Sequence, residues 1–289
     1  MTLPACVLCG APAPLRFRVR GHAVHRCDRC DLEFVWPTPD PATVRAVYAQ
    51  GYFTGAQGAG YDDYFGRERD IARRKADTRL AALRSLGFHG GRLLDVGCAA
   101  GYFVEAAAAA GWDAYGVEPS PEAREGASSA VASRVFETLD ASLARGPFDA
   151  VTLWDVLEHL PDPLATLRAL RGAMREGAAL GVVVPVLGSV NTRVAPRTWD
   201  QYKPPEHLWY WSPAAMRATL ARGAGARVLR EDVAWTRPSR FIDPGAASRS
   251  LPVRLGRAID AGVHRVLSVF SPALVVDSVA FYAVCEAPR

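Results

Sequence analysis

From about residue 92 onward, short apolar runs alternate with segments of helical periodicity. The apolar runs predict β-strands because they are short and are bounded by turn-forming residues. They lie at residues 92–96, 113–117, 134–136, 148–154, 180–184, 227–233 and 278–285. This alternation predicts an α/β fold, in which a parallel sheet carries helices on both faces. Ligands of such sheets bind at the carboxyl ends of the strands.

Two amphipathic stretches flank this region. Between residues 67 and 86, apolar side chains keep helical spacing at Ile71, Ala76, Leu80, Leu83 and Leu86. The other face is basic, which favours a solvated surface, with RNA binding as the alternative; it carries Arg67, Arg69, Arg73, Arg74, Lys75, Arg79 and Arg84. The second stretch predicts a C-terminal helical insert over 250–272, which would pack on its own domain, roof the site or form a homodimer contact.

Two further segments are rich in aromatic side chains. Residues 48–65 interleave tyrosine and phenylalanine with glycine, which predicts a loop that packs on another part of the protein. Residues 186–212 follow a core strand at its carboxyl end, where large rings can form a dry substrate pocket. The candidate substrate contacts, for which simple packing is the alternative, are Tyr52, Tyr64, Trp199, Tyr202 and Trp209.

Composition and charge exclude several classes of protein. The chain has 289 residues, 49% of them apolar and 22% charged, as in an ordinary globular protein. Its net charge of +4 is too small to indicate a nucleic-acid partner by itself. The longest apolar stretch, residues 178–187, is too short to span a bilayer, and the first residues lack the pattern of a signal peptide. We therefore expect a cytoplasmic protein with no membrane partner.

Two C-x-x-C pairs stand seventeen residues apart near the N-terminus, at Cys6, Cys9, Cys27 and Cys30. Each pair can form a tight turn that points two thiolates at one ion, and two such turns complete a tetrahedral zinc site. Gly10 follows the first pair, where a positive φ would help the turn, and Asp31 takes the matching place after the second. About forty residues cannot bury much of a core, so we expect structural Zn²⁺. Redox-active or chance pairs are the alternative.

A glycine turn, with Gly97 and Gly101, follows the first predicted strand. Its spacing differs from that of a dinucleotide-binding loop, because Tyr102 occupies the place of the third glycine. Asp95 would lie poorly beside a pyrophosphate but suits a positively charged ligand such as S-adenosylmethionine. Glu118 ends the next strand, where a carboxylate can accept both ribose hydroxyls. Together these residues favour S-adenosylmethionine as the cofactor.

Three motifs resemble those of class I S-adenosylmethionine-dependent methyltransferases: L-D-V-G-C-A-A-G at 94–101, G-V-E-P-S at 116–120 and the segment 148–160. The resemblance implies a seven-stranded Rossmann-like sheet with an antiparallel last strand, for which residues 281–286 are the candidate. Ala99 departs from the family, which often has glycine there. The implied cofactor-binding residues are Asp95, Gly97, Gly101, Tyr102, Glu118, Pro119, Thr138, Leu139, Trp154, Asp155 and Val156.

Two Glu-His pairs are candidates for acid–base chemistry. For Glu158-His159 a structural role is favoured, because a helix capped by Asp162 follows directly. His207 lies in the aromatic segment, and an imidazole can take a proton from a methyl acceptor at neutral pH. The alternative is a histidine that only satisfies a loop carbonyl.

The segment around Glu206-His207-Leu208 is similar to that of zinc-containing deoxysugar C-methyltransferases, which also carry a cysteine-rich N-terminal module. In that family the histidine is the base, assisted by the glutamate and by nearby tyrosines. The resemblance therefore implies His207 as the catalytic base, with Glu206 in support. Pro204 stands where that family tends to have tyrosine, which leaves the acceptor open.

The sequence thus predicts a zinc ribbon over 1–40, an aromatic loop and helical cap over 41–90, and a methyltransferase domain over 91–289 with the substrate segment 186–212. We expect methyl transfer to a small molecule, such as a specialised metabolite or a sugar. The alternatives are an RNA methyltransferase that uses the ribbon and the basic helix, and a non-catalytic zinc-dependent interaction protein. Lys203 is the single lysine or arginine between residues 199 and 211, which argues against nucleic acid.

Overall fold

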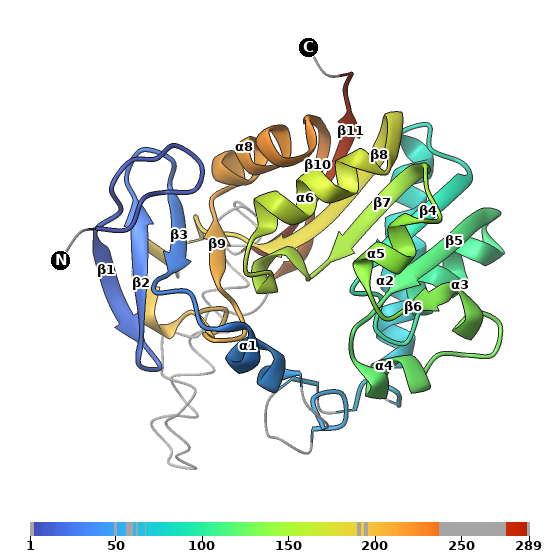
Figure 1. Ribbon diagram of the computed structural model, residues 1–289, viewed down its shortest axis with the longest axis horizontal. Helices are drawn as coiled ribbons and strands as arrows, with labels where there is room; N and C mark the ends of the chain where they lie inside the picture. The colour runs from blue at the N-terminus through green and yellow to red at the C-terminus, as the bar shows by residue number, and fades with distance from the viewer. Residues whose placement is uncertain are drawn as a thin grey trace. The chain divides into compact units, whose positions relative to one another are not determined.

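The computed structural model, shown in Figure 1, describes residues 3–48, 51–55, 60–61, 63–66, 68–189, 192–193, 196–236 and 276–287. The helical insert expected at 250–272 and Arg67 of the basic face lie outside these residues. The chain divides into two compact units. The ribbon unit comprises residues 1–39, 184–218 and 232–280, and the cofactor-loop unit comprises residues 40–183, 219–231 and 281–289.

A seven-stranded sheet has the order β10-β11-β8-β7-β4-β5-β6. Its strands are β4 (Gly91–Val96), β5 (Trp112–Val117), β6 (Val135–Phe136), β7 (Phe148–Trp154), β8 (Met174–Pro185), β10 (Ala226–Thr236) and β11 (Val276–Cys285). The pairs β4–β5, β4–β7, β5–β6 and β7–β8 are parallel, and β11 lies between β8 and β10 although it comes last in the chain. The predicted α/β fold with a seven-stranded Rossmann-like sheet is confirmed.

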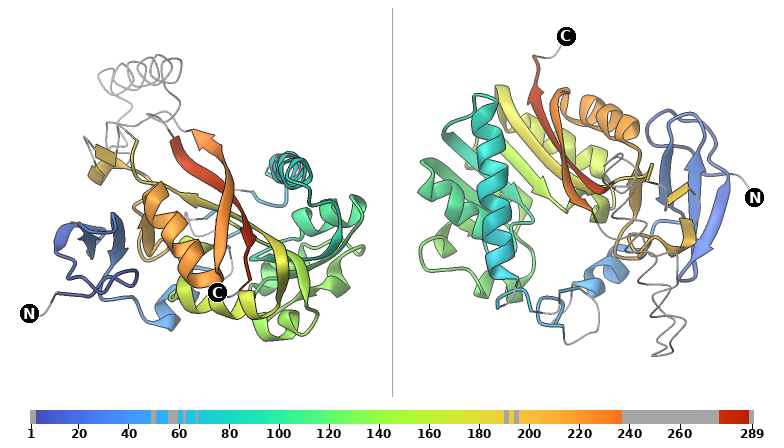
Figure 2. Two further views of the ribbon diagram at one scale, coloured as in Figure 1. Left: turned by 90° about the horizontal axis from the view of Figure 1, so that it is seen from above. Right: turned by 180° about the vertical axis from the view of Figure 1, so that it is seen from behind.

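Helices cover both faces of this sheet. In Figures 1 and 2, α2 (Arg69–Ser85) and α6 (Pro163–Gly172) lie on opposite faces of β4 and β7. The other helices described are α1 (Pro41–Val47), α3 (Tyr102–Ala109), α4 (Pro121–Glu125), α5 (Leu139–Leu143) and α8 (Pro213–Ala224), with short 3₁₀ turns η1 (Ala132–Arg134), η2 (Leu157–His159) and η3 (Pro196–Thr198).

Local sequence signals account for the bounds of these helices. The Asp162 carboxylate accepts a hydrogen bond from the backbone N–H of Ala165 at 2.9 Å, so it caps α6 as predicted. Helix α2 buries Ala76, Leu80, Ala82 and Leu83. Ile71, which shares the predicted helical spacing, lies in the first turn of α2 and is 44% exposed.

A smaller sheet, of order β1-β2-β3-β9, lies in the ribbon unit. Strands β1 (Leu15–Val19), β2 (His22–Cys27) and β3 (Leu32–Val35) form an antiparallel meander. The fourth strand, β9 (Trp209–Trp211), comes from the predicted substrate segment and pairs antiparallel with β3. The segment 186–212 is therefore hydrogen-bonded to the cysteine-rich module. Among the described residues, no helix is long and apolar enough to cross a membrane.

Candidate functional site

The glycine turn after β4 is built from left-handed backbone. Gly97, Ala99 and Gly101 have φ values of 68°, 47° and 73°. A Cβ on Gly97 would lie 2.5 Å from Cγ2 of Val156, so the Val156 side chain packed against the turn leaves no room for a larger residue there. The positive φ at Ala99 explains why glycine suits this position, because a left-handed conformation costs an L-residue about 1–2 kcal/mol.

Asp95 lies at the carboxyl end of β4 and is 2% exposed. Thr152 on β7 donates a hydrogen bond to Asp95 Oδ1 at 2.7 Å. Burial raises the pKa of Asp95 to about 7, although the Thr152 hydrogen bond and the positive charge of Arg79 oppose the shift. A buried carboxylate of this kind gains most from a ligand that brings a positive charge.

Glu118 follows β5 and points back at the glycine turn. Its Oε2 accepts a hydrogen bond from the backbone N–H of Ala99 at 3.0 Å, and its Oε1 accepts one from Ser120 at 2.8 Å. Burial raises the pKa of Glu118, while these two N–H donors favour the ionised form. A carboxylate has about four acceptor sites, so an oriented Glu118 retains capacity for two further donors, such as vicinal hydroxyls.

Trp154 ends β7, and Asp155 follows it with a positive φ of 59°. Arg79 of α2 stacks over the Trp154 ring, with Cζ 4.6 Å from the ring centroid, and its Nη2 lies 3.3 Å from Asp155 Oδ2. Within the described residues the buried indole N–H of Trp154 has no hydrogen-bond partner, which makes it a donor available to a ligand. Sequence reasoning placed Arg79 on a solvated face and missed this contact.

The other predicted cofactor residues surround the same turn or cap neighbouring elements. Tyr102 is buried at the start of α3, and Val156 packs against Gly97. Thr138 caps α5 by accepting a hydrogen bond from the N–H of Ala141 at 3.3 Å, and Leu139 is the first residue of that helix. Pro119 is exposed, and its carbonyl accepts a hydrogen bond from Arg124.

Tyr52 and Tyr64 belong to an aromatic cluster that packs against Ala99 of the glycine turn and against Ala123. Tyr64 stacks on Tyr102, with ring centroids 5.5 Å apart. The cluster is therefore next to the candidate cofactor site, and its other aromatic members are Tyr48, Phe53, Tyr61 and Phe65.

A contact that the sequence did not predict joins Tyr48 to His159. The Tyr48 Oη lies 2.6 Å from His159 Nδ1, and Glu158 Oε1 lies 3.8 Å from His159 Nε2. Because 111 residues separate Tyr48 from His159, no local pattern could have indicated this pair.

The rings of the predicted substrate segment are packed in the ribbon unit. Trp199 and Tyr202 are each 2% exposed and Trp209 is 5% exposed. The indole N–H of Trp199 donates to Asp277 Oδ1 at 2.8 Å, and Trp209 stacks on Phe34 of β3 with ring centroids 5.7 Å apart. These contacts give each ring a packing role.

The candidate base His207 is 3% exposed, and its Nδ1 lies 3.0 Å from the carbonyl oxygen of Gln201. A carbonyl oxygen can only accept, so Nδ1 carries the proton and Nε2 carries the lone pair. Glu206 is 7% exposed, and its Oε1 forms an ion pair with Nζ of Lys203 at 2.9 Å. The imidazole is thus held in the tautomer that can take up a proton at Nε2.

The comparison with protein families agrees with the geometry of the turn after β4. A family model described as "Methyltransferase domain" matches residues 67–231, more than half of the chain. The chain belongs to this methyltransferase family. Together with the sheet order, the match makes it a class I S-adenosylmethionine-dependent methyltransferase by family.

Curated relatives of this methyltransferase include ubiquinone biosynthesis O-methyltransferases. That of Xanthomonas oryzae pv. oryzae (strain PXO99A) is 37% identical over 167 residues, which cover 51% of this chain and 66% of the relative. That of Xanthomonas campestris pv. campestris (strain B100) is 38% identical over 99 residues, which cover 32% of this chain and 41% of the relative. The chain therefore spans less than two thirds of the length of these relatives.

Among solved structures, the fold is similar to that of magnesium protoporphyrin IX methyltransferase from Synechocystis PCC 6803 with bound SAH. The TM-score is 0.52, the sequences are 16% identical, and the match covers 85% of this chain and 98% of that chain. At this identity the likeness concerns the fold alone.

The methyltransferase also carries a four-cysteine cluster in the ribbon unit. Its four Sγ atoms lie within 4.8 Å of one another, and those of Cys9 and Cys27 are 3.6 Å apart. Tetrahedral zinc with bonds of about 2.3 Å requires sulfur–sulfur distances of about 3.8 Å, so the donor set is compatible with a zinc ribbon. Gly10 has the predicted positive φ, and Asp31 shares it at 54°.

The two cysteine turns have the same backbone hydrogen bond. Gly10 N–H donates to the Cys6 carbonyl and Asp31 N–H donates to the Cys27 carbonyl, each at 2.8 Å. Burial raises the pKa of Cys6 to about 11 and that of Cys30 to about 12, so both thiols hold their protons at neutral pH unless a cation replaces them. Cys98 and Cys285, outside this cluster, are buried.

Proposed function

We propose that the chain transfers a methyl group from S-adenosylmethionine to a hydroxyl of a small-molecule acceptor, and that Zn²⁺ holds the ribbon through Cys6, Cys9, Cys27 and Cys30. The observation that carries the proposal is the pair of buried carboxylates, Asp95 and Glu118, on either side of a left-handed glycine turn. The curated relatives, which are named as O-methyltransferases, support a hydroxyl as the acceptor group.

In this proposal S-adenosylmethionine supplies a methyl group that is already activated on a sulfonium. Glu118 accepts the ribose hydroxyls, because its oxygens are oriented by the backbone N–H groups of Ala99 and Ser120. Asp95 offers a buried negative charge to the positively charged end of the cofactor, and Trp154 offers its indole N–H. Transfer of an activated methyl group needs mainly positioning, and these fixed groups provide it.

His207 is the general base of the proposal. Its Nδ1–H is held by the Gln201 carbonyl, and its Nε2 takes the proton that the acceptor hydroxyl loses. Glu206, the residue before His207, is buried and forms an ion pair with Lys203, and in this proposal it supports the base.

The role of His207 is tested by label transfer from methyl-labelled S-adenosylmethionine into the small molecules of a host extract. We expect His207→Gln to lower turnover about 100-fold or more while the affinity for the cofactor is unchanged. His25→Gln is the matched control, because it removes another buried histidine whose Nδ1 lies 3.0 Å from a carbonyl oxygen, that of Ala13. If His207→Gln kept its turnover, or if His25→Gln lost as much, the assignment of the base would be wrong.

A further inference from the structure

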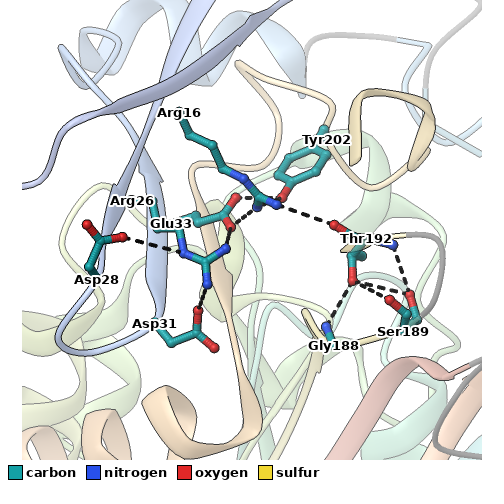
Figure 3. A network of polar contacts seen from close by, with 9 residues as sticks. All are labelled: Arg16, Arg26, Asp28, Asp31, Glu33, Gly188, Ser189, Thr192 and Tyr202. Carbon is teal, nitrogen blue, oxygen red and sulfur yellow. Dashed lines mark hydrogen bonds and ion pairs between the residues drawn. The ribbon is translucent and has the colours of Figure 1, made fainter. Parts of the chain in front are cut away.

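Glu33 on β3 is a carboxylate with no exposed surface. Figure 3 shows its partners: it forms an ion pair with Arg16 of β1, and its Oε2 accepts a hydrogen bond from the Tyr202 hydroxyl at 2.5 Å. Arg26 of β2 adds a second positive charge, with Nη1 3.6 Å from Glu33 Oε1. One charged side chain from each of β1, β2 and β3 therefore meets at the Glu33 carboxylate. The hydroxyl of Tyr202, from the segment 186–212, binds to the same carboxylate.

Arg16 also binds the segment 186–212 at a second residue, Thr192. Arg16 Nη1 donates to the Tyr202 hydroxyl at 3.0 Å, and Arg16 Nη2 donates to the carbonyl of Thr192 at 3.3 Å (Figure 3). The Tyr202 ring packs edge-on against Phe17, with centroids 5.0 Å apart. A buried ion pair adds little net stability compared with apolar packing, but its geometry is strict, so it serves better to fix a position than to stabilise a fold.

The position of Tyr202 bears directly on the imidazole of His207. Tyr202 is the residue after Gln201, and the Gln201 carbonyl accepts the His207 Nδ1–H at 3.0 Å. Any shift of Tyr202 moves this carbonyl. The carbonyl favours the tautomer with the proton on Nδ1, so moving the carbonyl away weakens that preference.

We propose that Glu33 is a positioning residue: through Tyr202 and the Gln201 carbonyl, it holds His207 in the tautomer with the proton on Nδ1. The ribbon is then a template for the segment that carries the candidate base. The importance of this tautomer for catalysis rests on the proposed function, whereas the tautomer itself is a property of the chain. Cys30 lies three residues before Glu33, which links the four-cysteine cluster to the strand that orients Tyr202.

The test is ¹⁵N NMR of the full-length zinc-loaded chain labelled at histidine, with the His207 signals identified by their absence in His207→Gln. We expect protonated Nδ1 and unprotonated Nε2 in the natural chain. Tyr202→Phe keeps the ring and removes the hydroxyl that binds Glu33. Because this hydrogen bond to a charged group is lost, we expect the ratio of the Nδ1-protonated to the Nε2-protonated tautomer to fall about tenfold. The matched control is Tyr115→Phe, which removes a hydroxyl bound to Asp113 at 3.2 Å.

Glu33→Gln is the second variant, with its zinc content measured to show that the ribbon has folded. We expect the same change of tautomer ratio with the metal retained. A ratio within about twofold of the natural chain in both variants would overturn the proposal. If the ratio changes as expected but His207→Gln still transfers methyl groups at the natural rate, the positioning role stands and the base assignment fails.

Discussion

At the scale of single residues, the buried carboxyl group of Asp95 links the stability of the chain to the binding of a positively charged ligand. Its folded pKa of about 7 lies above the value of about 4 for an unfolded chain, because burial disfavours the charged form. Between these values the folded chain holds a proton that the unfolded chain has released. The contribution of Asp95 to the stability of the unliganded chain therefore falls as the pH rises from about 4 to about 7.

Replacing Asp95 by asparagine should separate stability from binding. The asparagine amide could still accept the Thr152 hydrogen bond but carries no buried charge, so we expect the unfolding temperature at pH 8 to rise by at least about 2–4 °C. The affinity for S-adenosylmethionine should fall at least about tenfold, because its positive charge loses a partner. Thermal unfolding and calorimetric titration measure the two effects, with Asp77→Asn on the exposed face of α2 as control. A variant that is less stable and binds normally would contradict this role.

Asp95 and Glu118 could be predicted because each directly follows or ends an apolar run, and strand ends define the ligand edge of such a sheet. Arg79 could not be predicted as a site residue, because α2 has basic residues on several turns. Its stacking on Trp154 is what distinguishes it from the others, and that contact is visible only in the structure. In the sequence, Glu33 is an ordinary polar residue of a short strand. Its burial could not be predicted, because its partner Tyr202 lies 169 residues away in the chain.

At the scale of elements, the strands of the large sheet follow from local apolar runs, since a strand buried on both faces is continuously hydrophobic. The pairing of β3 with β9 has no such signal, because it joins distant parts of the chain, such as Phe34 and Trp209, through backbone hydrogen bonds that any sequence can form. The sequence therefore indicated an aromatic pocket where the structure has a fourth strand.

The shared sheet predicts that β9 depends on the four-cysteine cluster. Removing the metal with a chelator should lower the protection of amide hydrogens against exchange in β3 and β9 together, at least about tenfold, because Cys27 ends β2 and Cys30 precedes β3, so both strands lose the cation that fixes the turn between them. Strands β4 and β5 should keep their protection. Hydrogen exchange followed by mass spectrometry measures this, and adding zinc back is the control. Unchanged exchange in β9 after complete loss of metal would show that the strand does not need the ribbon.

At the scale of the whole molecule, the predicted cofactor residues from Asp95 to Val156 all belong to the cofactor-loop unit. The cysteine cluster and His207 belong to the ribbon unit. Local sequence motifs predicted both the cofactor residues and the cysteine and histidine candidates. The assignment of residues 184–218 to the ribbon unit depends instead on tertiary contacts that no motif encodes.

The division into two units predicts that binding of S-adenosylmethionine and binding of zinc can be lost separately. Glu118→Ala should abolish measurable binding of S-adenosylmethionine, because the ribose loses its acceptor, while zinc content and the exchange protection of β9 remain natural. Calorimetry and metal analysis on the same sample give both values. Loss of zinc from Glu118→Ala would argue against independent units.

The most direct test of the central claim is the fate of the methyl group. The purified chain is incubated with methyl-labelled S-adenosylmethionine and a host extract, which is then separated into small molecules, RNA and protein, with Glu118→Ala as the control. We predict label in the small-molecule fraction that is absent with the control. Label confined to RNA or protein, or equal labelling by Glu118→Ala, would contradict the proposed function.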